Sequence, residues 1–169
     1  MPVLKNAKHE IDCLRRLLAY DPITGSLHWR VDRYRVRAGD LAGQPHPRGY
    51  WTVTANQGRY LAHRLAWAIH YGSWPERHID HINGNKLDNS IANLRLASVA
   101  ENARNGRMRR TNTSGFKGVS YIAATGRWRA TIMVDGKQRW LGTHPTPEAA
   151  HAAYAVAAHQ MHGEFARAA

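Results

Sequence analysis

The chain has 169 residues, 43% of them hydrophobic, which suffices for one ordinary domain or two small ones. Lysine and arginine outnumber aspartate and glutamate by 24 to 12, and the formal net charge of +12 indicates a polyanionic partner, nucleic acid first and an anionic membrane surface second. No apolar run approaches the roughly 18 residues that span a bilayer, and the N-terminus lacks a signal-peptide pattern, so we expect an intracellular protein without a membrane segment. The single cysteine, Cys13, excludes an intrachain disulfide and a thiolate zinc site.

The N-terminal part of the chain mixes helical and β patterns. Leucines at helical spacing predict a short helix over residues 11–20, and a turn with Pro22 and Gly25 leads into a strand. In the stretch RVDRYRVR, residues 30–37, basic and apolar residues alternate, which would place several arginines on one face of a strand or loop. That face is either a solvated edge or a phosphate-facing surface.

Two β-rich runs follow, over residues 50–54 and 60–65, and the sequence ANQG between them predicts a hairpin turn. A short helix over residues 65–71 should end at Gly72. His63 lies in the second run among apolar neighbours, and we expect a structural role for it.

The next stretch, residues 77–94, has the sequence RHIDHINGNKLDNSIANL, in which INGN ends one strand and Asn93 opens a return strand, NLRLA. Ser98 is followed three residues later by Glu101, the arrangement of a capping box. A helix is therefore predicted over residues 98–105.

The C-terminal part has a different pattern. Beyond the linker-like stretch RMRRTNTSG, three β-rich runs, FKGVSYI, RWRATIMV and KQRWLGTH, are separated by turns at AATG and DG. Thr146, Pro147 and Glu148 then supply an N-cap, a first-turn proline and a first-turn acid for an alanine-rich helix that ends at Gly163. The sequence thus predicts an α+β chain whose last part, from Ser114 on, is a separate three-stranded antiparallel sheet with one helix.

The strand, loop, strand and helix of the middle region carry side chains suited to phosphodiester hydrolysis. Asp80 and His81 end the first strand, Asn93 comes twelve positions after His81, and Asn102 lies on the capped helix. A neutral imidazole, with an ordinary pKa of about 6.5, can take a proton from water at physiological pH. Carboxylate and amide oxygens are hard ligands for Mg²⁺ or Mn²⁺, and such an ion offsets charge that develops on a scissile phosphate. The alternative is an asparagine-rich turn with one aspartate.

This region resembles the HNH endonucleases, within the wider group of ββα-metal nucleases, and looks closest to the free-standing homing-type enzymes of phages and mobile elements. The resemblance covers roughly residues 27–105 and rests on HRLAW, DHINGN, DNSIANLRLA and ENARN. It implies that His81 is the general base and that Asn93 braces the loop and orients this base. It also implies that Asp80 and Asn102 bind one divalent metal ion.

The last letter of the family name HNH stands for a histidine, and this sequence has Asn102 at that motif position. An H-N-N version is known within the family, and the more oxygen-rich site favours Mg²⁺ or Mn²⁺ over Zn²⁺. Gly84 is expected to adopt a positive φ in the turn. The other polar residues of the loop are expected to shape it rather than bind metal: Asn83, Asn85, Asp88 and Asn89.

The C-terminal part resembles the plant ethylene-response-factor DNA-binding domain, the Apetala-two type, which is also found appended to HNH nucleases. The likeness spans Ser114 to about Phe165 and rests on SGFKGVS, GRWRATI, RWLGTH, EAAHAAY and HGEFA. It implies DNA binding through the sheet, and Trp128 is expected to be packed rather than stacked on DNA. The contact candidates by position are Lys117, Arg127, Arg129, Arg139 and Trp140.

Ser120 and Ile122 replace basic residues of the plant pattern, so the plant target sequence is not transferred to this chain. The stretch from residue 107 to residue 140 contains eight lysines and arginines but only one acidic residue, Asp135. The linker arginines among them are expected to follow the phosphate backbone or a minor groove: Arg107, Arg109 and Arg110.

The sequence therefore predicts an N-terminal helix and basic strand (1–38), an HNH nuclease domain (39–106), a basic linker (107–113) and an Apetala-two-like domain (114–169). The expected function is that of a homing-type DNA endonuclease that uses one Mg²⁺ or Mn²⁺ ion and no small-molecule cofactor. It would act on double-stranded DNA as a monomer or weak dimer, and one metal site would nick one strand at a time. The alternatives are a non-catalytic DNA-binding regulator with a degenerate nuclease fold and an RNA-binding protein, the latter disfavoured because no single-strand stacking motif is evident.

Overall fold

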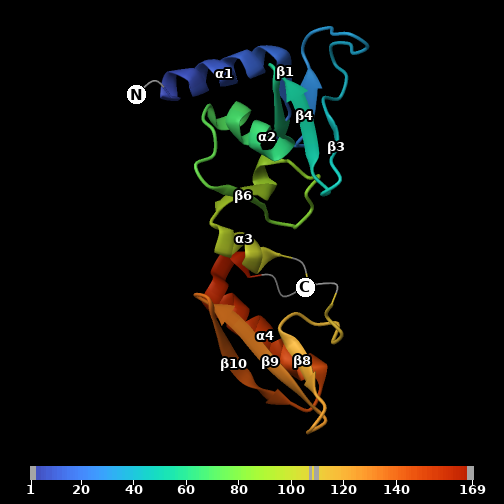
Figure 1. Ribbon diagram of the computed structural model, residues 1–169, viewed down its shortest axis with the longest axis vertical. Helices are drawn as coiled ribbons and strands as arrows, with labels where there is room; N and C mark the ends of the chain where they lie inside the picture. Colours follow the sequence, from blue (N-terminus) through green and yellow to red (C-terminus); the bar gives the residue numbers. More distant parts are fainter. Residues whose placement is uncertain (1–2, 107, 109–110, 167–169) are drawn as a thin grey trace. The chain divides into compact units, whose positions relative to one another are not determined.

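The structure is a computed structural model that describes residues 3–106, 108 and 111–166 (Figure 1). It divides into two compact units, one up to Ser98 and the other from Val99 on. The linker arginines Arg107, Arg109 and Arg110 lie outside the described residues.

The first unit begins with α1 (Val3–Leu17), an amphipathic helix that buries Ile11 and Leu14. The helix starts earlier and ends earlier than expected, because the residues after Leu17 form β1 (Leu18–Tyr20), which pairs antiparallel with β2 (Leu27–Trp29). The register matches Leu18 with Trp29, so both side chains face the core.

A second small sheet joins β3 (Gln44–Pro45), β4 (Trp51–Ala55) and β5 (Gly58–Leu61) in sequence order. The expected turn between β4 and β5 is confirmed, and Asn56 and Gln57 both have positive φ, as in a two-residue hairpin turn.

The helix α2 (Ala62–Tyr71) follows β5 directly and ends at Gly72, whose left-handed φ of 77° caps it. The expected β run over 60–65 is therefore wrong in its second half. Ala62, Leu65 and Ala66 are buried at helical spacing, and the packing of that face decides the element. His63 consequently lies on a buried helix and not in a strand.

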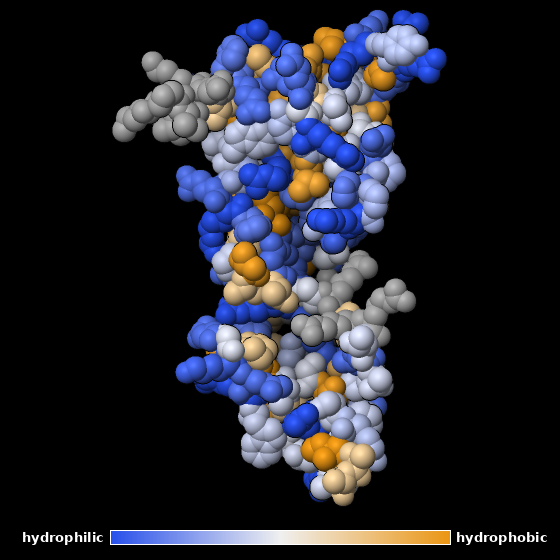
Figure 2. Space-filling view, viewed as in Figure 1, coloured by the Kyte–Doolittle hydropathy of each residue, from blue (hydrophilic) through white to orange (hydrophobic). Residues whose placement is uncertain are grey.

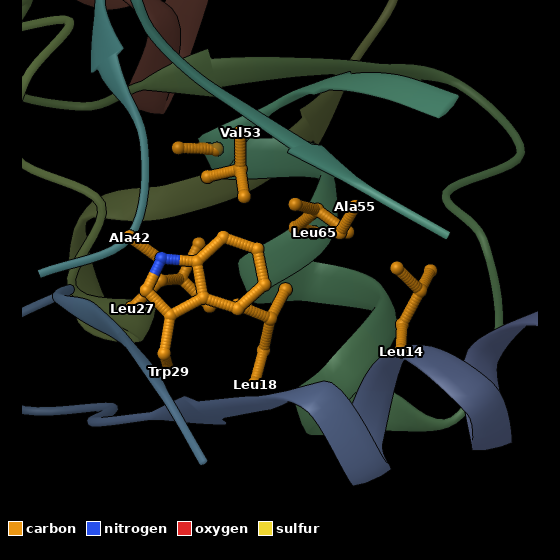
Figure 3. Packing of buried hydrophobic residues seen from close by; sticks show 9 residues of the cluster. Leu14, Leu18, Leu27, Trp29, Ala42, Val53, Ala55 and Leu65 are labelled. Atoms are coloured by element: carbon orange, nitrogen blue, oxygen red, sulfur yellow. The ribbon is translucent and has the colours of Figure 1, made fainter. Parts of the chain in front are cut away.

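One core joins the beginning of the first unit to its middle (Figure 3). Leu14 and Leu18 pack with Trp29, and these residues lie in one cluster with Val53 and Leu65. The segment 1–38, expected as a region of its own, thus shares its core with the sheet and helix that follow.

The first unit ends in a two-stranded antiparallel hairpin formed by β6 (His78–His81) and β7 (Leu94–Ala97), with the 3-10 turn η1 (Ile91–Asn93) before β7. Ala66 of α2 packs with Ile79 and Leu94 and so fixes the hairpin on the helix.

The second unit begins with α3 (Val99–Asn105), the helix predicted by the capping box. The contacts group α3 with this unit. The expected three-stranded antiparallel sheet is confirmed: β8 (Val119–Ile122), β9 (Arg127–Val134) and β10 (Lys137–His144), with β9 in the centre.

One face of this sheet packs on α4 (Pro147–His162), which the 3-10 turn η2 (Gly163–Phe165) follows (Figure 1). Thr146 caps the helix by accepting a hydrogen bond from the Ala149 N–H at 3.2 Å, as its sequence predicts. Ile132 and Tyr154 join the two layers. The fold is therefore α+β, with small antiparallel sheets and few helices.

Hydrophilic residues cover most of the visible face of the molecule (Figure 2). Over the described ranges, no helix combines the length and the apolar character that crossing a bilayer requires.

Candidate active site

The β6–β7 hairpin presents the predicted catalytic residues at the end where its loop begins. The register pairs Asp80 with Arg95 and His81 with Leu94. The loop leaves the strand through a tight turn in which the Gly84 N–H donates to the His81 carbonyl at 2.8 Å. Gly84 has a φ of +67°, as its place in the turn requires.

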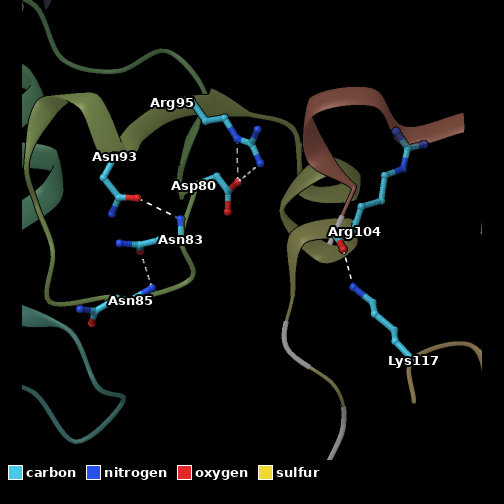
Figure 4. Close-up of polar contacts among 7 residues, drawn as sticks. All are labelled: Asp80, Asn83, Asn85, Asn93, Arg95, Arg104 and Lys117. Atoms are coloured by element: carbon cyan, nitrogen blue, oxygen red, sulfur yellow. Dashed lines mark hydrogen bonds and ion pairs between the residues drawn. The ribbon is translucent and has the colours of Figure 1, made fainter. Parts of the chain in front are cut away.

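Asn93 holds the long loop between the strands (Figure 4). Its Oδ1 accepts a hydrogen bond from the Asn83 N–H at 2.9 Å, and its Nδ2 donates to the Asp88 carbonyl at 2.8 Å. Since Asn93 is buried, these two bonds tie both ends of the loop to the start of β7.

Asp88 shapes the same loop from within. Its carboxylate accepts hydrogen bonds from the Ser90 hydroxyl at 2.7 Å and from Asn83 Nδ2 at 2.7 Å. The bond from Ser90 is the main cause that lowers the pKa of Asp88 below its ordinary value. This residue is therefore a loop former.

His81 is buried, with 5% of its surface exposed. Its Nε2 lies 3.2 Å from Oδ1 of Asn89, which is also buried. Burial lowers the pKa of His81 below its ordinary value, although the hydrogen bond with Asn89 opposes this shift. The imidazole is thus held in its neutral form.

Two further rings surround this imidazole. The His63 ring lies edge-on to that of His81, with centroids 5.1 Å apart, and the Tyr50 ring lies 5.3 Å from that of His63. Burial lowers the pKa of His63 to about 3, so this histidine is also neutral. A neutral, buried ring packed against the candidate base agrees with the structural role expected for His63.

A lysine of the loop lies beside these rings. Lys86 Nζ is 4.3 Å from the centroid of the Tyr50 ring and donates to the Arg48 carbonyl at 3.2 Å. This exposed ammonium brings positive charge to the Tyr50 ring, whose centroid lies 6.4 Å from that of His81.

Asp80 forms a buried ion pair across the hairpin. Arg95 donates to Asp80 Oδ2 through Nε at 2.9 Å and through Nη2 at 2.8 Å (Figure 4). Alternation along the strand turns Asp80 toward Arg95, whereas His81, the next residue, meets Asn89 and His63.

The donor set near the hairpin is rich in oxygen. Among the residues that the structure describes, no group of three histidine, cysteine, aspartate or glutamate side chains could hold a metal ion. A site built on Asp80 would therefore depend on amide oxygens and water besides its carboxylate, which suits Mg²⁺ or Mn²⁺. The buried carboxylate fits such an ion.

Asn102 lies on α3, in the second unit, whereas Asp80, His81 and Asn93 lie together in the first. The pairing of Asn102 with Asp80 therefore stays a prediction.

The second unit presents a sheet face on the side away from α4. Ser120 of β8 pairs with Arg129 of β9 and accepts a hydrogen bond from Arg129 Nε at 3.3 Å. Arg127 lies on the same face, two residues before Arg129, and Trp140, paired with Thr131, is 69% exposed there. This outer sheet face, defined by Arg127, Arg129 and Trp140, is both basic and aromatic.

The other two candidates of this unit lie elsewhere. Lys117 Nζ donates to the carbonyls of Arg104 and Gly106 at 2.6 and 2.9 Å, so this ammonium caps the end of α3 (Figure 4). Arg139 pairs with the buried Ile132 and therefore lies on the α4 side of the edge strand. Trp128 packs against the core, as expected.

Sequence reasoning did not single out two partners of the site. Asn89, expected only to shape the loop, contacts the His81 ring, and Arg95 engages Asp80. The Arg95 contact follows from the strand register, which pairs residues 80 and 95 once the two strands are recognised. For Asn89, spacing alone gave no signal.

Comparison with known proteins finds matches for both parts of the chain. Residues 60–104 match the family model described as HNH endonuclease, and residues 114–164 match that of the AP2 domain. The chain is 37% identical over 106 residues to Protein 3.8 of Escherichia phage T7, which covers 62% of this chain and 87% of that protein.

A second relative is the Uncharacterized HNH endonuclease L560 of Acanthamoeba polyphaga mimivirus, 32% identical over 118 residues. That match covers 69% of this chain but only 60% of the mimivirus protein. A solved structure, "DNA binding and cleavage by the HNH homing endonuclease I-HmuI", is similar with a TM-score of 0.40 and 20% identity, over 79% of this chain and 74% of that chain.

The hairpin with its Asp-His pair thus lies in the segment that matches the HNH endonuclease model, and the sheet-and-helix module that follows matches the AP2 domain. The chain belongs to the HNH endonuclease family.

Proposed function

We propose that this protein is a metal-dependent DNA endonuclease in which His81 is the general base. The observation that carries the proposal is the buried His81 imidazole at the end of β6, next in the chain to the Asp80 carboxylate. Both residues lie within the segment that matches the HNH endonuclease model.

In this reaction His81 takes a proton from water as the water oxygen bonds to phosphorus. The bond between phosphorus and the leaving oxygen breaks, and that oxygen takes a proton from solvent. Asn93 supports the geometry because it holds the loop that starts directly after His81.

Asp80 and Asn102 would hold the divalent ion, Mg²⁺ or Mn²⁺, through one carboxylate and one amide oxygen. A bound ion supplies positive charge that offsets the charge developing on the phosphate and on the leaving oxygen. The ammonium of Lys86, which lies over the Tyr50 ring, adds positive charge near the same site.

The outer sheet face of the second unit would hold double-stranded DNA, as the match to the AP2 domain supports. Arginine on a sheet can enter the major groove and bond to base edges. One metal site attacks one strand at a time, so we expect nicking by a monomer. The phage and giant-virus relatives support a DNA substrate inside an infected cell.

A supercoiled-plasmid assay tests this proposal. We expect nicking in Mg²⁺ or Mn²⁺ that EDTA abolishes and that His81→Ala lowers by at least about 100-fold. His159→Ala, which removes an exposed histidine of α4, is the matched control and should nick normally. DNA binding without nicking in either metal, on several DNA substrates, would overturn the proposal.

One observation favours a second candidate, a DNA-binding protein without catalysis. Arg95 already neutralises Asp80 inside the hairpin, with 12% and 7% of the two side chains exposed. If that pair persists in the presence of metal, the carboxylate stays engaged and the chain binds DNA only. The plasmid assay separates the two candidates, because only the nuclease converts supercoiled DNA to the open form.

A further inference from the structure

The candidate base has a buried amide partner that the family resemblance did not indicate. His81 Nε2 lies 3.2 Å from Asn89 Oδ1, and only 4% of the Asn89 surface is exposed. Asn93, which the resemblance names as the residue that orients the base, instead bonds to the loop backbone at Asn83 and Asp88.

The second bond of the Asn89 side chain fixes which way its amide points. Asn89 Nδ2 donates to the Leu87 carbonyl at 3.4 Å, which leaves Oδ1 toward His81. The reverse orientation would place two acceptors, Oδ1 and the Leu87 oxygen, against each other. An amide oxygen can only accept, so the hydrogen bond requires a proton on His81 Nε2.

A neutral imidazole carries one N–H, and the other ring nitrogen carries the lone pair. With the proton on Nε2, the basic atom is Nδ1.

The backbone of Asn89 is itself held by the N-terminal part of the first unit. The Tyr20 hydroxyl donates to the Asn89 carbonyl at 2.8 Å, and the Ile91 N–H donates to the Pro22 carbonyl at 3.0 Å. Gly25 lies so close that a Cβ there would be 2.3 Å from the Asn89 carbonyl carbon. Residues 20–25 precede the segment that matches the HNH endonuclease model, so the position of Asn89 depends on this chain's own N-terminal turn.

We infer that Asn89 is a positioning residue that holds His81 in the Nε2–H tautomer and so makes Nδ1 the atom that accepts the proton from water. The proton on Nε2 follows from the contact with Asn89, and the role of Nδ1 rests on the proposed nuclease function. Asn93 thus holds the loop, and Asn89 holds the His81 ring.

Nitrogen-15 NMR of the full chain with labelled histidine tests the inference, because the two neutral tautomers give different nitrogen shifts. The His81 signal is the one that His81→Ala removes. In the wild type we expect the Nε2–H pattern, and in Asn89→Ala a mixture of both tautomers. Asn89→Asp keeps an acceptor toward Nε2 but turns a second oxygen toward the Leu87 carbonyl, and at a pH where the His81 ring is neutral it should still show the Nε2–H pattern.

Cleavage rates give the second readout. Asn89→Ala should lower kcat by about 10- to 100-fold, the loss usual for a group that orients a functional side chain, and leave KM for plasmid unchanged. Asn89→Asp should recover part of the lost rate. Gln44→Ala, which removes an exposed amide of β3, is the control and should change neither the spectrum nor the rate.

An Nδ1–H pattern in the wild type would overturn the inference, as would an unchanged tautomer in a folded Asn89→Ala variant. If that variant does not fold, the spectra of the wild type and of Asn89→Asp still show which ring nitrogen of His81 carries the proton. The spectrum requires no cleavage, so a protein that never nicks DNA but shows the Nε2–H pattern lost in Asn89→Ala would refute the nuclease and keep the tautomer assignment.

Discussion

Arg95 and Asp80 form a cross-strand pair in which both Nε and Nη2 of the arginine donate to the single oxygen Oδ2 of the carboxylate, at 2.9 and 2.8 Å. The two residues are register partners in the β6–β7 hairpin, and both side chains are largely buried. The carboxylate expected to bind the metal is therefore already compensated by a cation of the fold.

Replacement of Arg95 should make the stability of the protein depend on metal. Arg95→Ala leaves a buried carboxylate without its cation, and we expect the free energy of unfolding to fall by about 3–5 kcal/mol. Mg²⁺ added to the variant should restore part of the loss, because a cation at Asp80 compensates the same charge. Urea unfolding with and without Mg²⁺ measures both effects.

Arg16→Ala removes an exposed arginine of α1 and should change stability little in either condition. If Mg²⁺ raises the unfolding midpoint of Arg95→Ala no more than that of Arg16→Ala, the ion does not compensate the charge that the lost guanidinium leaves on Asp80.

Gly25→Ala should disturb the turn that supports Asn89. Gly25 has a φ of +75°, and an added Cβ would lie 2.2 Å from the Ser90 nitrogen. The expected loss of stability is about 1 kcal/mol for the backbone conformation plus a larger amount for the clash. Gly39→Ala isolates the first contribution, since Gly39 has a φ of +93° with nothing within 4 Å of the added Cβ.

Thermal unfolding of the two glycine variants provides the measurement, and Gly25→Ala should unfold at a clearly lower temperature. If the two variants lose the same amount of stability, the turn around Gly25 and Asn89 accommodates the added methyl group without a clash.

His63 should make the protein less stable in mild acid. The unfolded chain binds a proton at His63 below a pH of about 6.5, whereas the folded chain keeps the ring neutral down to its pKa of about 3. The unfolded state binds more protons between these values, so the free energy of unfolding rises with pH in this window, by up to about 1.4 kcal/mol per pH unit from this residue.

His63→Phe removes the proton-binding group and should flatten the dependence of the urea midpoint on pH between 4 and 6.5. His81, whose pKa burial also lowers, contributes a remaining slope in the same direction. His159→Phe is the control on an exposed histidine and should keep the full slope; a slope unchanged in His63→Phe would contradict the neutral state assigned to His63.

The two sides of the C-terminal sheet should differ in DNA affinity. Arg129→Ala removes a charge from the outer sheet face, and we expect weaker binding and a salt dependence of log K reduced by about 1 if the arginine contacts a phosphate. Arg139→Ala removes a charge on the α4 side and should have a smaller effect.

Fluorescence anisotropy over a range of salt concentrations measures these constants. Trp140→Ala should lower affinity with little loss of stability, because the side chain is 69% exposed. A larger effect from Arg139 than from Arg129 would move the DNA-binding surface to the other side of the sheet.

Sequence pattern determined the elements whose signals are local. The spacing of Ser98 and Glu101 predicted α3, and Thr146 predicted the start of α4. The turn sequence that contains Asn56 and Gln57 predicted the β4–β5 hairpin. Each signal arises from hydrogen bonds or φ values within a few residues, so it is present in the chain before the chain folds.

Only the tertiary structure decided the partners of the site. The sequence gives Asp80 and His81 as neighbours, but packing on α2 brings His63 to the His81 ring, and the loop fold brings Asn89 rather than Asn93 to Nε2. His63 lies on a helix because Ala62, Leu65 and Ala66 are buried at helical spacing. Intrinsic propensity alone does not choose between a helix and a strand here. Spacing along the chain limits which residues can meet; the packing of the core selects which of them do.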